Sequence, residues 1–287
     1  MKKVLGILIV LGLLMGLVLF FNKTPKVEEI VIQEKVVQKY EVIGNSIEGR
    51  PIEVYRYGNG EKHLLFVGGI HGGYEWNSVL LAYEFIDYLD INPDIIPENI
   101  TLEIIPSANP DGVYKVTQKE GRFKVSDVSK DAEVLASGRF NANNVDLNRN
   151  FDCKWQSKST WRSKEVNAGR EVFSESESKT LRDFILKVKP LGVVLWHSQA
   201  NAVYASQCEE GILPKTLDML NAYSKGSDYK AIETFDAYVV TGAVEDWLAS
   251  INIPAITVEL KTHEVIEFEK NLGGTKELLK LYSKKGE

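Results

Sequence analysis

The chain has 287 residues, of which 44% are hydrophobic, 26% charged and 10% aromatic. This composition is that of a globular protein with ample material for a core, and it excludes a chain that is mainly disordered. Lys and Arg number 34 against 40 Asp and Glu, which gives a formal net charge of −6, and no long basic tract occurs away from the chain ends. A nucleic-acid partner is therefore not expected.

Residues 1–21 have the pattern of a membrane signal. Lys2 and Lys3 precede an uncharged apolar run, residues 4–21. The run reaches the lower end of the length that spans a bilayer, and no small-x-small cleavage site follows it, so an uncleaved anchor is favoured over a removed leader. A short basic N-terminus normally stays in the cytoplasm, which predicts a single-pass cell-membrane protein with its remainder outside, or a secreted protein if the leader is cleaved.

The rest of the chain divides into a linker and one domain. Residues 22–39 are polar and charged and contain Pro25, which indicates a linker. Residues 40–287 have a suitable length for one α/β domain, and they contain no internal repeat.

Within this domain, short β-rich runs alternate with helical patterns. Such alternation predicts a mixed or mainly parallel sheet with helices on both faces, and active residues at the strand ends and in the loops after them. Ser174 and Glu177 form the pattern of a capping box at one helix start. The expected strands are residues 52–57, 63–67, 100–105, 191–196 and 255–260, and the expected helices are residues 78–89, 175–188, 215–223, 243–249 and 274–283.

The first candidate site residues follow the second expected strand, in a glycine-rich turn at residues 68–76. This turn carries His71 and Glu75, and its four glycines allow a bend sharp enough to aim both side chains at one point. An imidazole and a carboxylate suit Zn²⁺. A packed or solvated His–Glu pair is the alternative for this segment alone.

A second imidazole lies where another apolar strand ends, at His197. With His71 and Glu75 it would complete a site of two histidines and one carboxylate that leaves a fourth position open, as catalytic zinc requires. Only two other histidines occur. His63 begins a strand and His263 lies in a charged run, so both are interpreted as structural or solvated.

Two further segments hold polar residues in notable positions. Residues 138–152 contain Arg139 and Arg149 among several amides. Arginine forks bind carboxylates, whereas a polar turn that satisfies its own backbone is the alternative. Glu259 lies inside an apolar, β-branched strand, where a carboxylate is costly unless it is paired or functional.

The chain has two cysteines, Cys153 and Cys208. An exported domain meets oxidising conditions, so we expect one disulfide between them. Two buried free thiols are the alternative, because a sequence does not show whether two Cα atoms come within bonding distance.

Short motifs follow one another in a specific order along the domain. They are Gly49-Arg50-Pro51-Ile52, His71 with Glu75-Trp76, Asn109-Pro110-Asp111-Gly112, Val145-Asp146-Leu147-Asn148-Arg149-Asn150, His197-Ser198, Tyr238 with Thr241-Gly242 and Asp246-Trp247, and Thr257-Val258-Glu259-Leu260. In this order and spacing the chain resembles the zinc metallocarboxypeptidases, the carboxypeptidase A-like family, over most of residues 40–287. The resemblance implies a catalytic domain with a mixed, mostly parallel eight-stranded sheet, one zinc ion per chain at the strand ends, and a peptide substrate with a free C-terminal carboxylate.

The resemblance also implies that His71, Glu75 and His197 are the zinc ligands. One departure stands out, because the family's usual motif places the glutamate three positions after the histidine, whereas Glu75 follows His71 by four. Gly72 and Gly73 could absorb the extra residue in a wider turn.

The remaining roles follow from the same resemblance. Glu259 corresponds to the general base that takes a proton from the attacking water, and Arg139 to the arginine that polarises the scissile carbonyl and stabilises the oxyanion. Asn148 and Arg149 correspond to the clamp for the substrate's terminal carboxylate, and Tyr238 to the mobile tyrosine that closes over it.

Glu245 lies about where family members set their primary specificity pocket. An acid there would favour a basic or amine-bearing terminal residue such as Lys, Arg or diaminopimelate. A solvent-facing helix glutamate is the alternative. The expected function is that of a membrane-anchored zinc metallocarboxypeptidase. An amidase-like cell-wall peptide hydrolase of the same family and a non-catalytic peptide-binding pseudoenzyme are the alternatives.

Overall fold

A computed structural model of the chain describes residues 39–284. The predicted anchor, residues 1–21, and all but the last residue of the predicted linker lie outside the described residues. None of the helices within residues 39–284 is long and apolar enough to cross a membrane.

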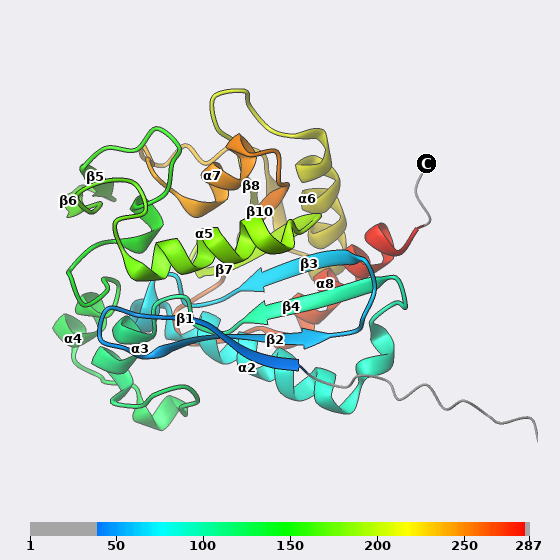
Figure 1. Ribbon diagram of the computed structural model, residues 1–287, viewed down its shortest axis with the longest axis horizontal. Helices are drawn as coiled ribbons and strands as arrows, with labels where there is room; N and C mark the ends of the chain where they lie inside the picture. Colours follow the sequence, from blue (N-terminus) through cyan, green and yellow to red (C-terminus); the bar gives the residue numbers. More distant parts are fainter. Residues whose placement is uncertain (1–38, 285–287) are drawn as a thin grey trace, which may run out of the picture. The chain divides into compact units, whose positions relative to one another are not determined.

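An eight-stranded sheet forms the centre of this domain (Figure 1), with the strand order β1-β2-β4-β3-β7-β10-β8-β9. The central pairs β4–β3, β3–β7 and β7–β10 are parallel, as is β8–β9, whereas β1–β2, β2–β4 and β10–β8 are antiparallel. The predicted mixed, mostly parallel sheet is confirmed. Its strands are β1 (Lys39–Asn45), β2 (Pro51–Tyr57), β3 (Lys62–Val67), β4 (Ile100–Ile105), β7 (Gly192–Ser198), β8 (Ala202–Ala205), β9 (Lys230–Ile232) and β10 (Ala255–Leu260).

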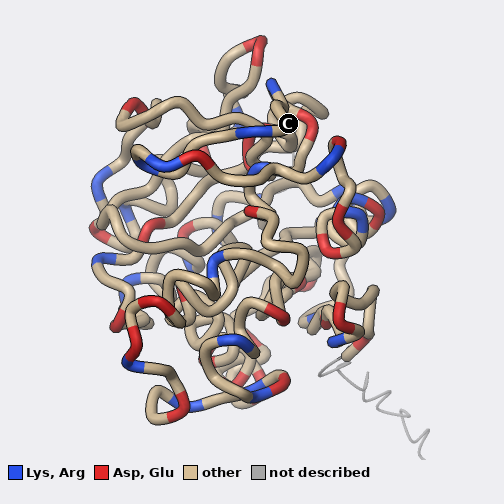
Figure 2. The backbone as a smooth tube through the Cα atoms, turned by 90° about the vertical axis from the view of Figure 1, so that its left-hand side faces the viewer, with Lys and Arg blue, Asp and Glu red and all other residues tan. Residues whose placement is uncertain are grey.

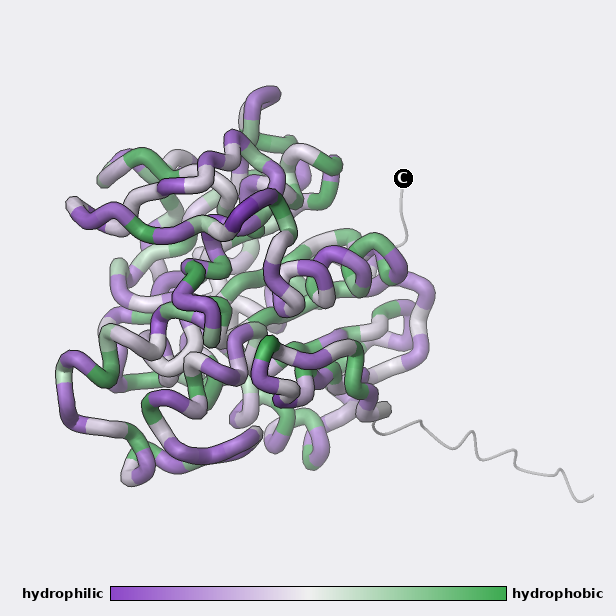
Figure 3. Tube along the Cα trace, turned by 60° about the vertical axis from the view of Figure 1, so that its left-hand side comes forward, coloured by the Kyte–Doolittle hydropathy of each residue, from purple (hydrophilic) through white to green (hydrophobic). Residues whose placement is uncertain are grey.

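Helices cover both faces of the sheet, because alternate side chains of each central strand point to opposite sides. In β3, Leu64 and Phe66 join a core beneath α2, α6 and α8, whereas Leu65 and Val67 join a second core beneath α5 and α7. Along these helices hydrophobic and hydrophilic stretches alternate (Figure 3), as expected for amphipathic segments. The helices are α2 (Trp76–Ile91), α3 (Pro110–Thr117), α4 (Ala132–Ser137), α5 (Ser176–Val188), α6 (Pro214–Ser227), α7 (Val244–Ser250) and α8 (Phe268–Ser283).

Two sequence-based expectations about helices are wrong in detail. Helix α5 has Glu175 at its N-cap with no side-chain cap bond, and the Ser174 hydroxyl donates to Glu175 Oε1 instead, so the predicted capping box is not formed. Helix α8 begins at Phe268, six residues before the predicted start. Gly273 and Gly274 lie inside this helix where α8 crosses α6, and a Cβ at either position would collide with α6.

Acidic and basic residues are interspersed along the described chain (Figure 2). A separate two-stranded hairpin, β5 (Lys158–Trp161) and β6 (Lys164–Asn167), lies outside the main sheet.

The predicted disulfide between Cys153 and Cys208 is present, with the two Cα atoms 6.2 Å apart. It closes a loop across 55 sequence positions and joins the segment after residues 147–149 to the segment after β8. Both cysteines line the cavity described below. The bond therefore fixes two segments that are far apart in sequence at one wall of that cavity.

Removing this bond should destabilise the domain. We expect the double variant Cys153→Ala/Cys208→Ala to lose about 4 kcal/mol of unfolding free energy, because a loop of this length restricts the unfolded chain by about that amount. Urea unfolding of the two proteins measures the difference. Equal midpoints with equal slopes would contradict the expectation.

Candidate functional site

The three predicted metal ligands meet at the carboxyl ends of the central strands. His71 follows β3, Glu75 ends the short helical turn Gly72–Glu75, and His197 lies near the end of β7. All three side chains are buried, and one ligand atom from each lies within 4.8 Å of the others. Among residues 39–284 this is the one group of three or more histidine, cysteine or acidic side chains close enough to hold a metal ion.

The glycine turn brings Glu75 into the cluster despite the four-residue spacing. Gly72 has a φ of 47°, in the left-handed region that glycine adopts readily. A Cβ on Gly73 would collide with Gly112 O and Val116. Tyr74 N–H donates to His71 O at 3.2 Å and closes the turn. The residues that resembled an insertion therefore form a tight helical turn packed on α3.

Electrostatics within the cluster favour a charged carboxylate. Burial alone would raise the pKa of Glu75, but His71 and His197 outweigh it and lower that pKa to about 2. His197 Nδ1 lies 3.2 Å from Glu75 Oε2. Burial would lower the pKa of His197, whereas this carboxylate raises it to about 9. Burial, and then Arg139, lower the pKa of His71 to about 4.

The donor set fits a zinc ion. His197 Nε2 is buried and has no hydrogen-bond partner within the described residues, whereas His71 Nδ1 lies 3.4 Å from Asp146 Oδ1. Buried polar atoms are normally paired, so a nitrogen left in the state of His197 Nε2 points to a missing partner. Two imidazoles and one carboxylate are a known ligand set for catalytic zinc.

Asp146 and Arg139 form a buried ion pair next to the cluster. Arg139 donates from Nε to Asp146 Oδ2 at 2.9 Å, and its Nη2 lies 2.9 Å from the same oxygen. Burial would raise the pKa of Asp146, but Arg139 and His71 hold it well below its usual range. Arg139 Nη1 lies 3.9 Å from Glu75 Oε1, and the guanidinium lies 4.5 Å from the ring centroid of Trp161. These contacts hold the guanidinium next to the side chains of His71, Glu75 and His197.

Glu259 lies directly beside the cluster. It is the register partner of His197 across the parallel pair β10–β7, so the two side chains point to the same face. Its Oε2 atom is buried without a hydrogen-bond partner in the described part of the chain. Burial, and then repulsion from Glu75, raise the pKa of Glu259 to about 7. A carboxylate with this pKa can both take up and release a proton near neutral pH.

The other predicted residues lie farther along the same cavity. Asn148 Oδ1 accepts from Val244 N–H at 2.9 Å, and its Nδ2 donates to Glu245 Oε1 at 3.4 Å. Arg149 donates to Thr160 O from Nε and Nη2 at 3.1 Å each, and to Asn148 O from Nη1 at 2.6 Å.

All nine predicted site residues line one cavity of about 670 Å³. They are His71, Glu75, Arg139, Asn148, Arg149, His197, Tyr238, Glu245 and Glu259. The residues near the site that the sequence did not single out are Asp146, Trp161, Asn77 and Ser198, and His263 was interpreted as structural or solvated. Asp146 and Ser198 occurred within quoted motifs, but no sequence signal separated them from their neighbours.

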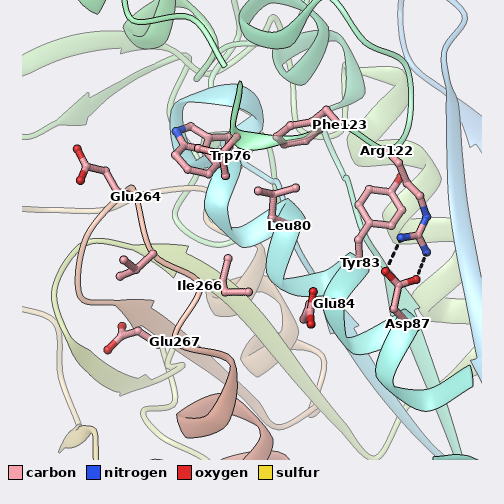
Figure 4. A pocket seen from close by; sticks show the side chains of 12 residues that line it. Trp76, Leu80, Tyr83, Glu84, Asp87, Arg122, Phe123, Glu264, Ile266 and Glu267 are labelled. Atoms are coloured by element: carbon pink, nitrogen blue, oxygen red, sulfur yellow. Dashed lines mark hydrogen bonds and ion pairs between the residues drawn. The ribbon is translucent and has the colours of Figure 1, made fainter. Parts of the chain in front are cut away.

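A second cavity of about 500 Å³ lies beside α2 and contains none of the nine residues (Figure 4). Trp76 and Leu80 of α2 line it together with Ile266 and Glu264 from the segment before α8. At its far end Arg122 pairs with Asp87. This cavity therefore shares a wall with the segment after β10, but among the described residues it holds no group of three histidine, cysteine or acidic side chains close enough to bind a metal ion.

Comparison with known proteins agrees with this geometry. A family model described as zinc carboxypeptidase matches residues 27–277. The chain is 25% identical over 240 residues to gamma-D-glutamyl-L-diamino acid endopeptidase 1 of Lysinibacillus sphaericus, which covers 76% of this chain and 59% of that protein. It is 31% identical over 156 residues to carboxypeptidase B of Astacus astacus, which covers 51% of this chain and 49% of that protein. The chain thus spans about half of the length of these relatives.

Among solved structures, the murein-tripeptide amidase of Escherichia coli O157 superposes with a TM-score of 0.59 at 21% identity, over 84% of this chain and 91% of that one. At this identity the superposition establishes a shared fold.

Proposed function

Because the chain belongs to the zinc carboxypeptidase family, we propose that it is a zinc-dependent metallopeptidase that hydrolyses a peptide bond at or near a free C-terminus. The observation that carries this proposal is the convergence of the His71, Glu75 and His197 cluster with Glu259 and Arg139 in one cavity. Residues 40–287 would form the catalytic domain.

His71, Glu75 and His197 would hold one zinc ion per chain. Zinc bound there would polarise the substrate carbonyl and make a water molecule acidic enough to attack near neutral pH.

The chain's own residues would supply proton transfer and charge stabilisation. Glu259 accepts the proton of the attacking water and passes it to the leaving amine, a role that suits its raised pKa. Arg139 donates hydrogen bonds to the developing oxyanion, and its ion pair with Asp146 keeps it in place before the substrate arrives.

Three residues would position the end of the substrate. Three of the five N–H donors of Arg149 are bonded to backbone carbonyls of the described chain, which leaves two for the terminal carboxylate. Asn148 lies next to it, and Tyr238 lies on the same cavity wall, in the segment that also carries the largely exposed Val239. This arrangement would orient the scissile bond rather than react with it.

Activity should fall as the pH drops through the pKa of Glu259, because a general base must be deprotonated. That pKa lies at about 7, above its ordinary value of 4.5. A cation held by Glu75 would offset the repulsion from that carboxylate, so the acidic limb should fall between these two values. A plot of kcat/KM against pH measures the limb. A profile that stays flat down to pH 4.5 would contradict the role of Glu259.

Glu245 would select substrates with an amine in the terminal side chain. Its Oε2 atom is buried without a hydrogen-bond partner among the described residues, at the wall of the cavity. We expect Glu245→Gln to lower kcat/KM for a peptide ending in Lys by about 10- to 100-fold, the value of a charge-assisted hydrogen bond, and to change little for a peptide ending in Leu. An equal loss on both peptides would show that Glu245 is structural.

The names of two relatives favour a cell-wall peptide as the natural substrate. One is named for a γ-D-glutamyl-diamino acid bond and the other for a murein tripeptide. Incubation with a diaminopimelate-containing stem peptide and with an ordinary Lys-ended peptide, followed by mass spectrometry, tests this. Release of diaminopimelate alone supports the cell-wall amidase alternative. Release of Lys supports a general carboxypeptidase. Cleavage of neither would favour a peptide-binding pseudoenzyme.

A cell-wall substrate agrees with the predicted location of the enzyme. Residues 1–21 would anchor the chain in the membrane and place the catalytic domain outside the cytoplasm. The Cys153–Cys208 disulfide supports this location, because such bonds persist in oxidising compartments.

A further inference from the structure

A second layer of hydrogen bonds lies behind Glu75. Ser198, the residue after His197, donates its backbone N–H to Glu75 Oε2 at 3.2 Å. The Ser198 hydroxyl donates to Asn77 Oδ1 at 3.0 Å and lies 2.7 Å from His263 Nδ1. Ser198 thus binds the Glu75 carboxylate through its backbone, while its own side chain contacts both Asn77 and His263.

One arrangement of the protons satisfies all the contacts of this network. Asn77 Nδ2 donates to Thr262 O at 2.6 Å and to Val265 O at 3.0 Å, so Asn77 Oδ1 must be the acceptor that faces Ser198. A serine hydroxyl has a single proton, and it goes to Asn77. His263 Nδ1 must therefore carry a hydrogen and donate it to Ser198 Oγ. Each of these contacts then has one donor and one acceptor, whereas His263 Nε2 is buried without a hydrogen-bond partner among the described residues.

The network joins the three segments that carry the candidate chemistry. Asn77 lies in the first turn of α2, two residues after Glu75, Ser198 ends β7, and His263 follows β10. The His263 ring also packs on Tyr74, the residue before Glu75, with the ring centroids 4.7 Å apart. Figure 4 shows the same segment, at Glu264 and Ile266, lying beside the start of α2. Glu75 is thus supported through its neighbour Tyr74, through Asn77 and through two other segments.

We propose that Asn77, Ser198 and His263 are positioning residues that fix the Glu75 carboxylate for metal binding. The inference rests on the proposed function, in which this cluster binds zinc. The turn from His71 to Glu75 is closed by the hydrogen bond from Tyr74 N–H to His71 O, which fixes the backbone. The hydrogen bond from Ser198, whose side chain is held by Asn77 and His263, fixes the carboxylate of Glu75. Partners of this kind behind metal ligands set both ligand orientation and metal affinity.

Zinc affinity of the full chain, measured by competition with a chromogenic chelator, tests this role without depending on turnover. We expect His263→Ala to weaken zinc binding by about 10- to 100-fold, the usual effect of losing an outer partner of a ligand. His263→Asn places an amide nitrogen where Nδ1 lies, so it should restore most of the affinity. His63→Ala is the matched control, because His63 pairs with Glu103 at the opposite end of β3 and should leave zinc affinity unchanged.

The zinc-affinity results distinguish a failure of the positioning role from a failure of the proposed function. A wild-type chain that binds no zinc overturns the proposed function and this role with it. A wild-type chain that binds zinc, with His263→Ala equally tight, overturns the positioning role alone. Equal weakening in His263→Ala and His263→Asn also overturns it, because the hydrogen bond would then be irrelevant. If His263→Ala does not fold, Ser198→Ala removes the same hydroxyl anchor and should weaken zinc binding to the same degree.

Discussion

Replacing Glu259 with glutamine should lower kcat by about 10²- to 10⁴-fold and leave zinc binding intact. Glutamine keeps the size of the side chain and its carbonyl oxygen but cannot accept a proton from water. Glu259 has no other visible task, because its Oε2 atom has no hydrogen-bond partner in the described residues. The loss should therefore appear in kcat rather than in stability.

The matched control for this variant is Glu264→Gln, five residues later in the segment that follows β10. Glu264 is exposed and does not line the cavity that contains the nine site residues. Its variant should retain wild-type turnover. If Glu259→Gln with a full complement of zinc hydrolysed peptides at the wild-type rate, Glu259 would not be the general base.

Replacing His197 with alanine should lower activity at least as much as the Glu259→Gln substitution does. Catalytic zinc in sites of this type is held by three protein ligands, and this change leaves two. It also leaves Glu75 without the imidazole that lies 3.2 Å from its Oε2 atom. Turnover should be lost together with bound zinc, and excess zinc should restore only a part of it. Wild-type turnover in this variant would contradict the assignment, whereas His63→Ala should behave as the wild type.

Apolar periodicity was sufficient to predict the central strands but not the edges of the sheet. Strands β3, β7 and β10 are buried on both faces, so their sequences are almost continuous apolar runs. Strand β9 has only three residues, and the exposed β1 mixes charged with apolar positions. Such strands form because a neighbouring strand offers free backbone hydrogen-bonding groups, and the local sequence does not indicate where such a neighbour lies.

The site could be predicted where strand ends bring residues together, since the carboxyl ends of parallel strands share one edge. His71, His197 and Glu259 all follow this rule. The interpretation of His263 as structural or solvated missed its contacts with Ser198 and Tyr74. These contacts arise because the segment after β10 folds back against α2, far away in sequence. The role of Asp146 could not be predicted for the same reason, because it depends on the contacts of its carboxylate with Arg139 and His71, which only the folded chain shows.

Zinc binding by His71, Glu75 and His197 can be measured by elemental analysis of the full chain, purified without added metal, alongside His71→Ala. We predict about one zinc ion per chain in the wild type and none in the variant. A wild-type chain that holds no zinc, even after reconstitution with the metal, would show that these three residues do not form a zinc site.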